Sequence, residues 1–531
     1  MSTTSCHPRD YCIGPMVLTS SDPEPFTINA PIADTLNQLW HPVVQQNGCV
    51  FKPVEHFEVA MLNLIFHPNI NSTSIMRADI LYDSGIDSPK DVAISYDDYE
   101  TKEKEICCEI EKLGIFLRSN RVEGVRIKRR IIREIIPRNQ DKDLPMRQSC
   151  LLLSDGAGSS SILFLPHGIE SPETTPYYHP AVSGILLHYT STRTHNDVNT
   201  LQLFYRLFSP SPETVVLPNR LERTALRLLA TAYKHSLGVM NGYQKRVQHD
   251  VVIDKVSFQD TYVSLKRRYA RDLVSRWVES TDPKKHVFED LAIAAFLMEL
   301  WDTKYTEKDS AKNNIRFVDI GCGNGVLVYI LNMEGYTGYG FDARRRKTWG
   351  IFPDLVQDCL REEVLVPHLC LDTDMETGNK GLRFHDGKFP EGTFLIGNHS
   401  DELTPWIPLL GQPFMVIPCC SHALSGAKYR YRTSIELRLE SAPRHNQQKL
   451  STYGALVEHV AKTAHDVGWV VEREMLRIPS TRNAAIIGVE RRSGDDMGRI
   501  WTAEDIIRRE GGAAGFSDRV VALTSKNPRS H

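Results

Sequence analysis

The segment most informative about the fold of this chain is Phe317-Val318-Asp319-Ile320-Gly321-Cys322-Gly323-Asn324-Gly325. Its apolar beginning is typical of a buried strand, and three glycines at alternate positions follow it. Glycine adopts positive φ without a steric penalty, so such a turn lets the backbone approach a ligand closely. The apolar segment 326–331 predicts a helix, whose first N–H groups have no partners within the helix. The stretch therefore predicts a strand, a ligand-binding turn and a helix, in that order.

The spacing of these glycines favours one class of cofactor. Dinucleotide-binding folds carry G-x-G-x-x-G and place a pyrophosphate over the helix N-terminus, whereas this chain has D-x-G-x-G-x-G. The carboxylate of Asp319 disfavours a pyrophosphate and favours the cationic methionine portion of S-adenosylmethionine. A second apolar run ends in Asp342, and an acid at the end of the second strand binds the ribose hydroxyls of a nucleoside cofactor. The predicted S-adenosylmethionine-binding residues are Asp319, Gly321, Cys322, Gly323, Asn324, Gly325 and Asp342.

The length and charge of the chain limit its organisation and its partners. A chain of 531 residues is too long for a single compact core, so we expect two or three domains. The net charge of −3 provides no overall basic field, so a surface that binds nucleic acid has to be a local patch.

The cysteines and the N-terminus bear on the compartment. Eleven cysteines are scattered without a Cys-x-x-Cys pair, and no pair of histidines completes a zinc ligand set, so we predict no metal. An odd number of cysteines without a secretory signal favours a reducing compartment, and the first ten residues lack an apolar core. No apolar run reaches the length of about 18 residues that spans a membrane. We therefore expect a cytoplasmic protein with no membrane partner.

Changes in sequence character along the chain predict its domains. We expect a flexible N-terminus at 1–30, an α+β domain with antiparallel strands at 31–240, and a helical lead-in at 241–310. Strands alternate with helices over 311–490, which predicts a doubly wound, mostly parallel sheet. The expected strands of this sheet are 316–320, 337–341, a strand near 365–371, 393–396, 413–417 and a late antiparallel strand at 482–489. Residues 491–531 form a polar tail with a short helix at 502–509.

Several longer motifs point to one family. The most specific run is Asn398-His399-Ser400-Asp401-Glu402-Leu403-Thr404-Pro405-Trp406-Ile407-Pro408. Further matching runs lie at 67–72, 136–139, 177–180, 282–290, 417–420 and 478–483. With the glycine-rich turn, these motifs resemble the eukaryotic tRNA (uracil-2′-O-)-methyltransferases over residues 45–490. The resemblance implies an α/β, class I S-adenosylmethionine-dependent methyltransferase fold, which is Rossmann-like, after an N-terminal α+β domain that engages tRNA. It also implies methylation of a uridine ribose at the base of the variable arm of serine tRNA.

The polar cluster after residues 394–396 is the candidate catalytic site. The fourth strand of a methyltransferase sheet ends beside the methyl group of the cofactor. A ribose hydroxyl is a weak nucleophile at neutral pH, so a positioned base contributes roughly 10²–10⁴-fold to the rate. We expect Asp401 or Glu402 to accept the proton, with His399 as a competitor, and Asn398 to help orient the hydroxyl. Alternatively, Asp401 only caps the following helix.

Adjacent cysteines lie after the fifth expected strand. Cys419 and Cys420, with His422 nearby, allow a thiolate to attack a pyrimidine ring, as in methylation of a base carbon. Small residues also suit a tight turn beneath the substrate. We favour the tight turn, because the resemblance implies ribose chemistry.

Basic residues are the candidate contacts to tRNA phosphates. The segment 118–138, which includes Arg118 and Arg121, carries eight Lys and Arg against two Glu, and its alternation predicts a strand or hairpin with one cationic face. A second basic stretch is 266–271. Trp406 is a candidate for stacking on the target base; the alternative is that it belongs to the core. The predicted substrate-binding residues are Arg126, Lys128, Arg130, Arg138, Arg345, Trp406, Lys428 and Arg482.

The sequence thus predicts S-adenosylmethionine-dependent 2′-O-methylation of a uridine in tRNA, with serine tRNA as the partner. One alternative is a methyltransferase that acts on another RNA or on a protein. Another is a non-catalytic scaffold that binds RNA through its basic segments. A nicotinamide-dependent enzyme fits the glycine spacing least well, and the sequence predicts no particular protein partner.

Overall fold

The computed structural model describes residues 40–85, 108, 110–113, 115, 126–154, 158–190, 199–208, 217–244, 249–305, 315–370, 383–431, 451–493 and 499–525. The chain divides into two compact units, unit 1 (Met1–Gln244) and unit 2 (Lys245–His531). The segment 1–30, which we expected to be flexible, lies outside the described residues. Among the helices of the described residues, none has the length and apolar character that a membrane span requires.

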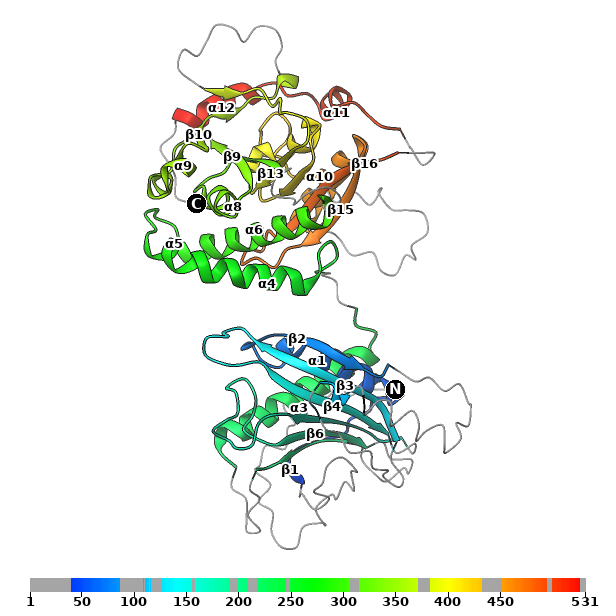
Figure 1. Ribbon diagram of the computed structural model, residues 1–531. Helices are drawn as coiled ribbons and strands as arrows, with labels where there is room; N and C mark the ends of the chain where they lie inside the picture. Colours follow the sequence, from blue (N-terminus) through cyan, green and yellow to red (C-terminus); the bar gives the residue numbers. More distant parts are fainter. Residues whose placement is uncertain are drawn as a thin grey trace. The chain divides into compact units, whose positions relative to one another are not determined.

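Unit 1 is a seven-stranded antiparallel sheet with the order β1-β7-β6-β5-β4-β3-β2 (Figure 1). Its strands are β1 (Trp40–Asn47), β2 (Ile75–Asp83), β3 (Arg126–Pro137), β4 (Met146–Ser154), β5 (Ser160–Pro166), β6 (Gly184–Thr190) and β7 (Thr200–Arg206). Its helices are α1 (Glu55–Phe66), the short η1 (Pro68–Ile70) and α3 (Asn219–Met240). This arrangement is the expected α+β fold with antiparallel strands.

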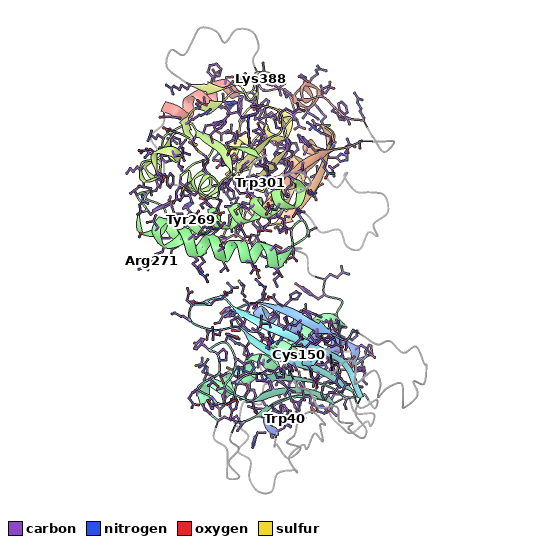
Figure 2. All side chains as sticks on the ribbon, viewed as in Figure 1. Trp40, Cys150, Tyr269, Arg271, Trp301 and Lys388 are labelled. Atoms are coloured by element: carbon purple, nitrogen blue, oxygen red, sulfur yellow. The ribbon has the colours of Figure 1, made fainter. Side chains whose placement is uncertain are left out.

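The period-two alternation of the strands divides the core of unit 1 between the two faces of the sheet. Leu152 and Ile162 pack with residues of α1 and α3 on one face, whereas Leu151 and Leu163 pack on the other. Cys150 belongs to the helix-facing core and lies in the interior of the unit (Figure 2). The long helix α3 contributes buried residues at helical spacing: Leu221, Ala225, Leu229, Ala232 and Ser236.

Unit 2 is built on a second seven-stranded sheet, with the order β10-β9-β8-β13-β14-β16-β15. Neighbours from β10 to β14 are parallel, and β16 runs antiparallel to both β14 and β15. The strands are β8 (Arg316–Ile320), β9 (Thr337–Asp342), β10 (Leu360–Glu362), β13 (Thr393–Asn398), β14 (Phe414–Ile417), β15 (Trp469–Met475) and β16 (Ala484–Arg491). The sheet is mostly parallel, as the alternation of strands and helices predicted.

Helices cover both faces of this sheet (Figure 1). One face carries α4 (Lys255–Leu265), the π-helical η2 (Lys266–Ala270), α5 (Arg271–Ser275), α6 (Pro283–Tyr305) and α8 (Val326–Met333). The other face carries η7 (Ile407–Leu410), α10 (Thr452–Asp466), α11 (Ala503–Arg509) and α12 (Phe516–Ser525). Short elements between strands are η3 (Lys347–Ile351), α9 (Asp354–Gln357), η4 (His368–Cys370) and η6 (Asp401–Leu403). Trp301 of α6 is fully buried in the core on the face that carries α4, α6 and α8 (Figure 2).

Two local expectations for unit 2 need correction. The third strand is Leu360–Glu362 rather than a strand near 365–371, because the apolar Val364–Leu365 (β11) pairs with Phe384–His385 (β12) in a separate two-stranded sheet. The tail contains the expected helix at Ala503–Arg509, which begins with a capping box at Thr502. It also contains α12, which the sequence analysis missed, and whose Phe516 is buried in the core.

Candidate functional site

The glycine-rich turn connects β8 to α8 in a backbone conformation that favours glycine. Gly321, Gly323 and Gly325 have φ values of 78°, 52° and 75°, all in the left-handed region. A Cβ on Gly325 would lie 3.0–3.1 Å from atoms of Leu360 and Trp349. Only glycine therefore fits this turn without strain, and its close packing fixes the path of the backbone.

Asp342 ends β9 and lies against this turn. Its Oδ2 accepts a hydrogen bond of 3.0 Å from the N–H of Gly323, and its Oδ1 accepts one of 3.2 Å from the N–H of Arg344. The guanidinium of Arg346 lies 3.8 Å from the same Oδ1. These contacts hold the carboxylate beside the turn, which is where the sequence placed an acid at the end of the second strand.

Asp319 is a buried acid whose carboxylate is only partly satisfied. The residue is 1% exposed, and its Oδ1 has no hydrogen-bond partner among the described residues. Burial raises the pKa of Asp319, and the negative charges of Asp290 and Asp342 raise it further. An unpartnered buried carboxylate oxygen costs free energy unless a ligand supplies its partner.

Asp290 completes this arrangement from α6, and the sequence analysis did not identify it. Its Oδ1 accepts a hydrogen bond of 3.1 Å from Nδ2 of Asn398, whose own Oδ1 is buried without a partner among the described residues. Burial and the charge of Glu289 raise the pKa of Asp290 to about 7, although hydrogen bonds from Asn324 and Asn398 oppose that shift. The sequence did contain a signal, which is the pair of acids directly before the apolar run 291–298. Acids that adjoin such a buried run are themselves candidates for burial, and buried acids are rare unless they have a partner.

Glu289, Asp290, Asp319 and Asp342 form what we call the acidic cluster. Burial and mutual repulsion disfavour ionisation of Asp290 and Asp319. Within the described parts of the chain, the ion pairs of these four acids are with Arg346 and with His399 only. A positively charged ligand group would remove the repulsion and supply hydrogen-bond donors. The cluster therefore fits a cation next to a glycine-rich turn.

The predicted catalytic residues follow β13 in a strained backbone. His399 and Asp401 have φ values of 54° and 43°, which residues other than glycine rarely adopt. Nε2 of His399 lies 3.1 Å from Oε1 of Glu289, and Oδ1 of Asp401 accepts a hydrogen bond of 3.0 Å from the thiol of Cys419. Burial raises the pKa of Glu402, and the charge of Asp401 adds to that shift. Ser400 holds the N-cap position of η6 without a side-chain cap bond, so the structure does not support a capping role for Asp401.

The adjacent cysteines lie beside Asp401, but their environment disfavours a thiolate. Burial raises the pKa of Cys419, and the carboxylate of Asp401 raises it further. A nucleophilic cysteine needs the opposite shift, so methylation of a base carbon through a thiolate lacks support. Among the described residues, Asp401, Cys419 and Cys420 also place three possible metal-ligand atoms within 4.8 Å of one another. The absence of a metal therefore stays a prediction.

The predicted substrate contacts in unit 2 divide into exposed cations and one buried ring. Arg345, Lys428 and Arg482 are exposed. Arg482 stacks over the ring of Tyr453 at 4.5 Å, and its charge opposes the rise that burial causes in the pKa of Cys420. Trp406 has 0% exposure, and its Nε1–H donates to the carbonyl of Leu424 at 3.1 Å. The expectation that Trp406 stacks on a base is therefore wrong, because this ring belongs to the core.

The described part of the basic segment in unit 1 does not form the expected cationic face. Arg118 and Arg121 lie outside the described residues, and Arg126 begins β3. Arg130 is only 3% exposed, so it cannot offer its guanidinium to a phosphate, and Lys128 pairs with Glu58 at 2.7 Å. Among the predicted contacts of this segment whose exposure the structure describes, Arg138 alone is exposed.

These buried cations have partners within unit 1. Arg129 pairs with Asp83 at 2.6 Å. Arg133 is 4% exposed and donates to Gln148 Oε1 at 2.6 Å and to the carbonyls of Leu64 and Ile65. Because those carbonyls lie in the last turn of α1, Arg133 stabilises the C-terminal end of that helix. The charges of this segment therefore hold unit 1 together.

Comparisons with known proteins agree with this division of the chain. Residues 18–246 match the family model "TRM44-like, N-terminal bet v1-like domain", and residues 252–367 match "Predicted AdoMet-dependent methyltransferase". The chain is 44% identical to a tRNA (uracil-O(2)-)-methyltransferase of Eremothecium gossypii, covering 90% of this chain and 94% of the relative. It is 40% identical to the enzymes of that name from Saccharomyces cerevisiae, covering 93% and 95%, and Schizosaccharomyces pombe, covering 97% of each. The crystal structure of Ara h 8.0201 matches 38% of this chain and 99% of its own, with 7% identity and a TM-score of 0.21.

Proposed function

The chain belongs to the family of tRNA (uracil-O(2)-)-methyltransferases, and from the resemblance of its motifs to that family we propose that its substrate is serine tRNA. Its activity is the S-adenosylmethionine-dependent 2′-O-methylation of a uridine in tRNA. The modified ribose lies at the base of the variable arm, as the resemblance of its motifs to the family implies.

We assign the catalytic unit to the class I methyltransferase fold. When the strands of the large sheet in unit 2 are numbered in chain order, the order β10-β9-β8-β13-β14-β16-β15 becomes 3-2-1-4-5-7-6. The antiparallel seventh strand and the ligand-binding turn after the first strand support this assignment. We propose 311–490 as the catalytic domain, 241–310 as its helical lead-in, 491–531 as a C-terminal tail and 31–240 as the tRNA-engaging domain.

The unpartnered carboxylate oxygen of Asp319, buried beside the glycine-rich turn, is the observation that carries the proposed cofactor site. We propose that Asp319 and Asp290 hold the ammonium group of S-adenosylmethionine, and that Asp342 binds its ribose hydroxyls. The turn supplies backbone at close approach through Gly321, Cys322, Gly323, Asn324 and Gly325. When bound, the cofactor supplies a methyl group activated by its sulfonium charge. The main task of the protein is then to align the hydroxyl oxygen with that methyl group.

The polar residues after β13 act on the ribose in this proposal. Asn398, which already donates to Asp290, connects the cofactor site to the segment that contains His399, Asp401 and Glu402. These residues orient the 2′-hydroxyl and accept its proton. Phosphate contacts come from the exposed Arg138, Arg345, Lys428 and Arg482. Further contacts come from three exposed basic residues of η2 and α5, which are Lys266, Arg267 and Arg271.

We also propose that the protein works in the cytoplasm. The described cysteines are free, and the adjacent Cys419 and Cys420 are among them. Free thiols in this number are typical of a reducing compartment.

The identity of the methylated nucleoside tests the proposed function. The protein is incubated with methyl-labelled S-adenosylmethionine and total tRNA, and the labelled tRNA is isolated and digested to nucleosides. We expect label in 2′-O-methyluridine from serine tRNA. As a matched control, a serine tRNA with 2′-deoxyuridine at the labelled position should accept no methyl group.

Each other outcome of that experiment rejects a defined part of the proposal. Label in 2′-O-methyluridine of a different tRNA would reject serine tRNA as the substrate. Label that persists on the deoxyuridine control would indicate methylation of the base. Cofactor binding without label in any tRNA would favour a non-catalytic scaffold.

A further inference from the structure

An ion pair between two distant segments lies at the end of β13. Glu289 belongs to α6, and its Oε1 lies 3.1 Å from Nε2 of His399, which is 110 positions later in the chain. Ile396 of β13 pairs with Asp319 of β8, so His399 follows the strand that adjoins the glycine-rich turn. The pair therefore lies at the same sheet edge as the proposed cofactor site.

The backbone holds His399 in an unusual conformation. Its φ of 54° lies in the left-handed region, and its N–H donates to the carbonyl of Ile417 at the end of β14. Residues other than glycine are strained in this region and persist where the surrounding structure fixes them, often at functional sites. The neighbouring strand thus helps to fix where the imidazole stands.

The two partners differ in exposure. The side chain of Glu289 is 8% exposed, whereas that of His399 is 25% exposed. The carboxylate is therefore on the protein side of the pair, and part of the ring is open to solvent. Nε2 faces Glu289, and none of the hydrogen bonds described for the protein involves Nδ1 of His399.

Charged and titratable groups surround the pair from each adjoining element. His286 and Asp290 come from α6, and His286 interacts electrostatically with both Glu289 and His399. Asp319 comes from β8, and the charge of Asp290 acts on it. Asp401 and Glu402 follow His399 in η6, and Cys419 follows β14. Most of the titratable groups around the pair are thus carboxyl groups.

We propose that His399 is the base that accepts the 2′-hydroxyl proton and that Glu289 is its positioning residue. This inference rests on the proposed 2′-O-methylation. The Nε2–H of His399 donates to the carboxylate of Glu289, so the lone pair of the neutral ring lies on Nδ1. The carboxylate orients the ring and stabilises the imidazolium that forms, as an acid does for histidine in hydrolytic triads.

The proton and the electrons balance in this step. The 2′-hydroxyl proton moves to Nδ1 of His399, and the oxygen electron pair forms the new O–C bond. The electron pair of the broken C–S bond stays on the cofactor sulfur, which becomes neutral. The imidazolium then releases its proton to solvent through its exposed side.

Asp401 suits this role less well. Its Oδ1 already accepts the thiol hydrogen of Cys419 at 3.0 Å. A proton on Asp401 would require this hydrogen bond to weaken during each turnover. His399 has no such competing partner on Nδ1 among the described residues.

His399→Asn and Glu289→Gln test the dyad. Asparagine tolerates the left-handed backbone, so His399→Asn removes the base while keeping the conformation. We expect the single-turnover methylation rate to fall roughly 10²–10⁴-fold in His399→Asn, with cofactor affinity by calorimetry unchanged. Glu289→Gln should lower the rate less and move the acid limb of its pH profile to lower pH, because a negative charge beside the base is lost. The double variant should be no slower than His399→Asn alone.

A spectroscopic readout separates positioning from a structural role. In protein labelled with ¹⁵N-histidine, His399 should show the Nε2–H tautomer, and Glu289→Gln should shift it toward a mixture. Matched controls are His465→Asn, at an exposed histidine of α10, and Glu510→Gln, whose carboxylate lies 3.7 Å from His459 outside this cluster. Both controls should methylate at the rate of the unmodified protein.

Three results would overturn the dyad. They are a normal rate in His399→Asn, an unchanged pH profile in Glu289→Gln, and an unchanged tautomer in Glu289→Gln. Failure of the underlying function looks different, because the unmodified protein would then place no methyl group on a uridine 2′-oxygen.

Discussion

The acidic cluster of unit 2 and the basic strand β3 of unit 1 both bury charge, but they do so in opposite ways. In β3, Lys128 and Arg129 each face a carboxylate, and Arg133 donates to an amide oxygen and to two helix carbonyls. In the acidic cluster, carboxylates face one another, and Oδ1 of Asp319 has no partner in the part of the chain that the structure describes.

The presence or absence of partners distinguishes charges that stabilise the fold from charges that are candidates for binding a ligand. Partners offset part of the desolvation cost of a buried charge, whereas a buried charge without partners lowers stability. Such a cost is typical of a binding site, because a ligand can offset it. The charge-dense segment of unit 1 is therefore structural, and the acids of unit 2 are the better candidates for function.

The largest effect is expected at Asp319. In Asp319→Asn the charge that faces the cofactor ammonium is lost, and losing one partner of a buried charged pair costs about 2–5 kcal/mol. We expect calorimetry to show a fall in S-adenosylmethionine affinity of at least about 30-fold, with no loss of stability in the cofactor-free protein. The matched control is Asp466→Asn, because Asp466 pairs with Lys462 at 2.6 Å and with Arg509 at 2.8 Å. Asp466→Asn should lower stability and leave cofactor affinity unchanged. The reverse pattern in the two variants would contradict the division between ligand-binding and structural charges.

Arg133 should show the opposite behaviour. Arg133→Met leaves the carbonyls of Leu64 and Ile65 and the amide oxygen of Gln148 without their donor, at a cost of about 1–3 kcal/mol for each unsatisfied group. We expect faster amide hydrogen exchange in α1 and β3 and a lower unfolding temperature for unit 1. S-adenosylmethionine affinity should stay the same. Unchanged exchange in α1 would show that the guanidinium is not what stabilises the end of that helix.

Asp342→Ala distinguishes the proposed ribose contact from the proposed ammonium contact within the acidic cluster. Charge-assisted hydrogen bonds contribute about 1.5–3 kcal/mol, so we expect a loss of roughly one to two decades in cofactor affinity. Adenosine has the ribose but no ammonium group. Compared with the unmodified protein, Asp342→Ala should bind adenosine more weakly, and Asp319→Asn should bind it equally well. Equal binding of adenosine to both variants would contradict the assignment of Asp342 to the ribose.

The smallest effect concerns tRNA. Lys428 and Arg482 are exposed, whereas Lys128 is paired with Glu58. Each lost phosphate contact reduces the slope of log affinity against log salt by about 0.7–0.9. Lys428→Gln and Arg482→Gln should each reduce the slope by that amount, and Lys128→Gln should not. A reduced slope in Lys128→Gln would show that β3 does contact tRNA phosphates.

The sequence predicted those parts of the site that are formed by residues close together in the chain. Asp319 and Asp342 stand at the ends of consecutive strands beside a glycine-rich turn, so their neighbourhood follows from the chain path. Glu289 and Asp290 come from a helix before the first strand, and their contacts with His399 and Asn398 depend on how that helix packs. Such long-range contacts leave little trace in local spacing.

Burial was the other property that local sequence did not reveal. The alternation in 126–137 identifies a strand, but both faces of β3 are covered, so Arg130 and Arg133 lie inside. The third strand of unit 2 was missed for a similar reason, because its Arg361 and Glu362 are exposed and the apolar run beside it is buried elsewhere. Trp406 illustrates the converse, since an aromatic ring near a site can belong entirely to the core.

The protonation of Asp290 gives the acidic cluster a measurable dependence on pH. Burial and the charge of Glu289 raise its pKa to about 7, so the folded protein keeps a proton that the unfolded chain releases near pH 4. The stability of the cofactor-free protein should therefore fall as pH rises from about 4 to 7. A bound ammonium group favours the ionised carboxylate, so cofactor affinity should rise over the upper part of this range.

Proton release on cofactor binding tests the cation site most directly. Calorimetric titrations of S-adenosylmethionine at pH 7, in buffers of different ionisation enthalpy, give the number of protons released. The cation site predicts release of up to about half a proton more from the unmodified protein than from Asp290→Asn. Equal proton release from the two proteins, or net uptake by the unmodified one relative to the variant, would contradict it.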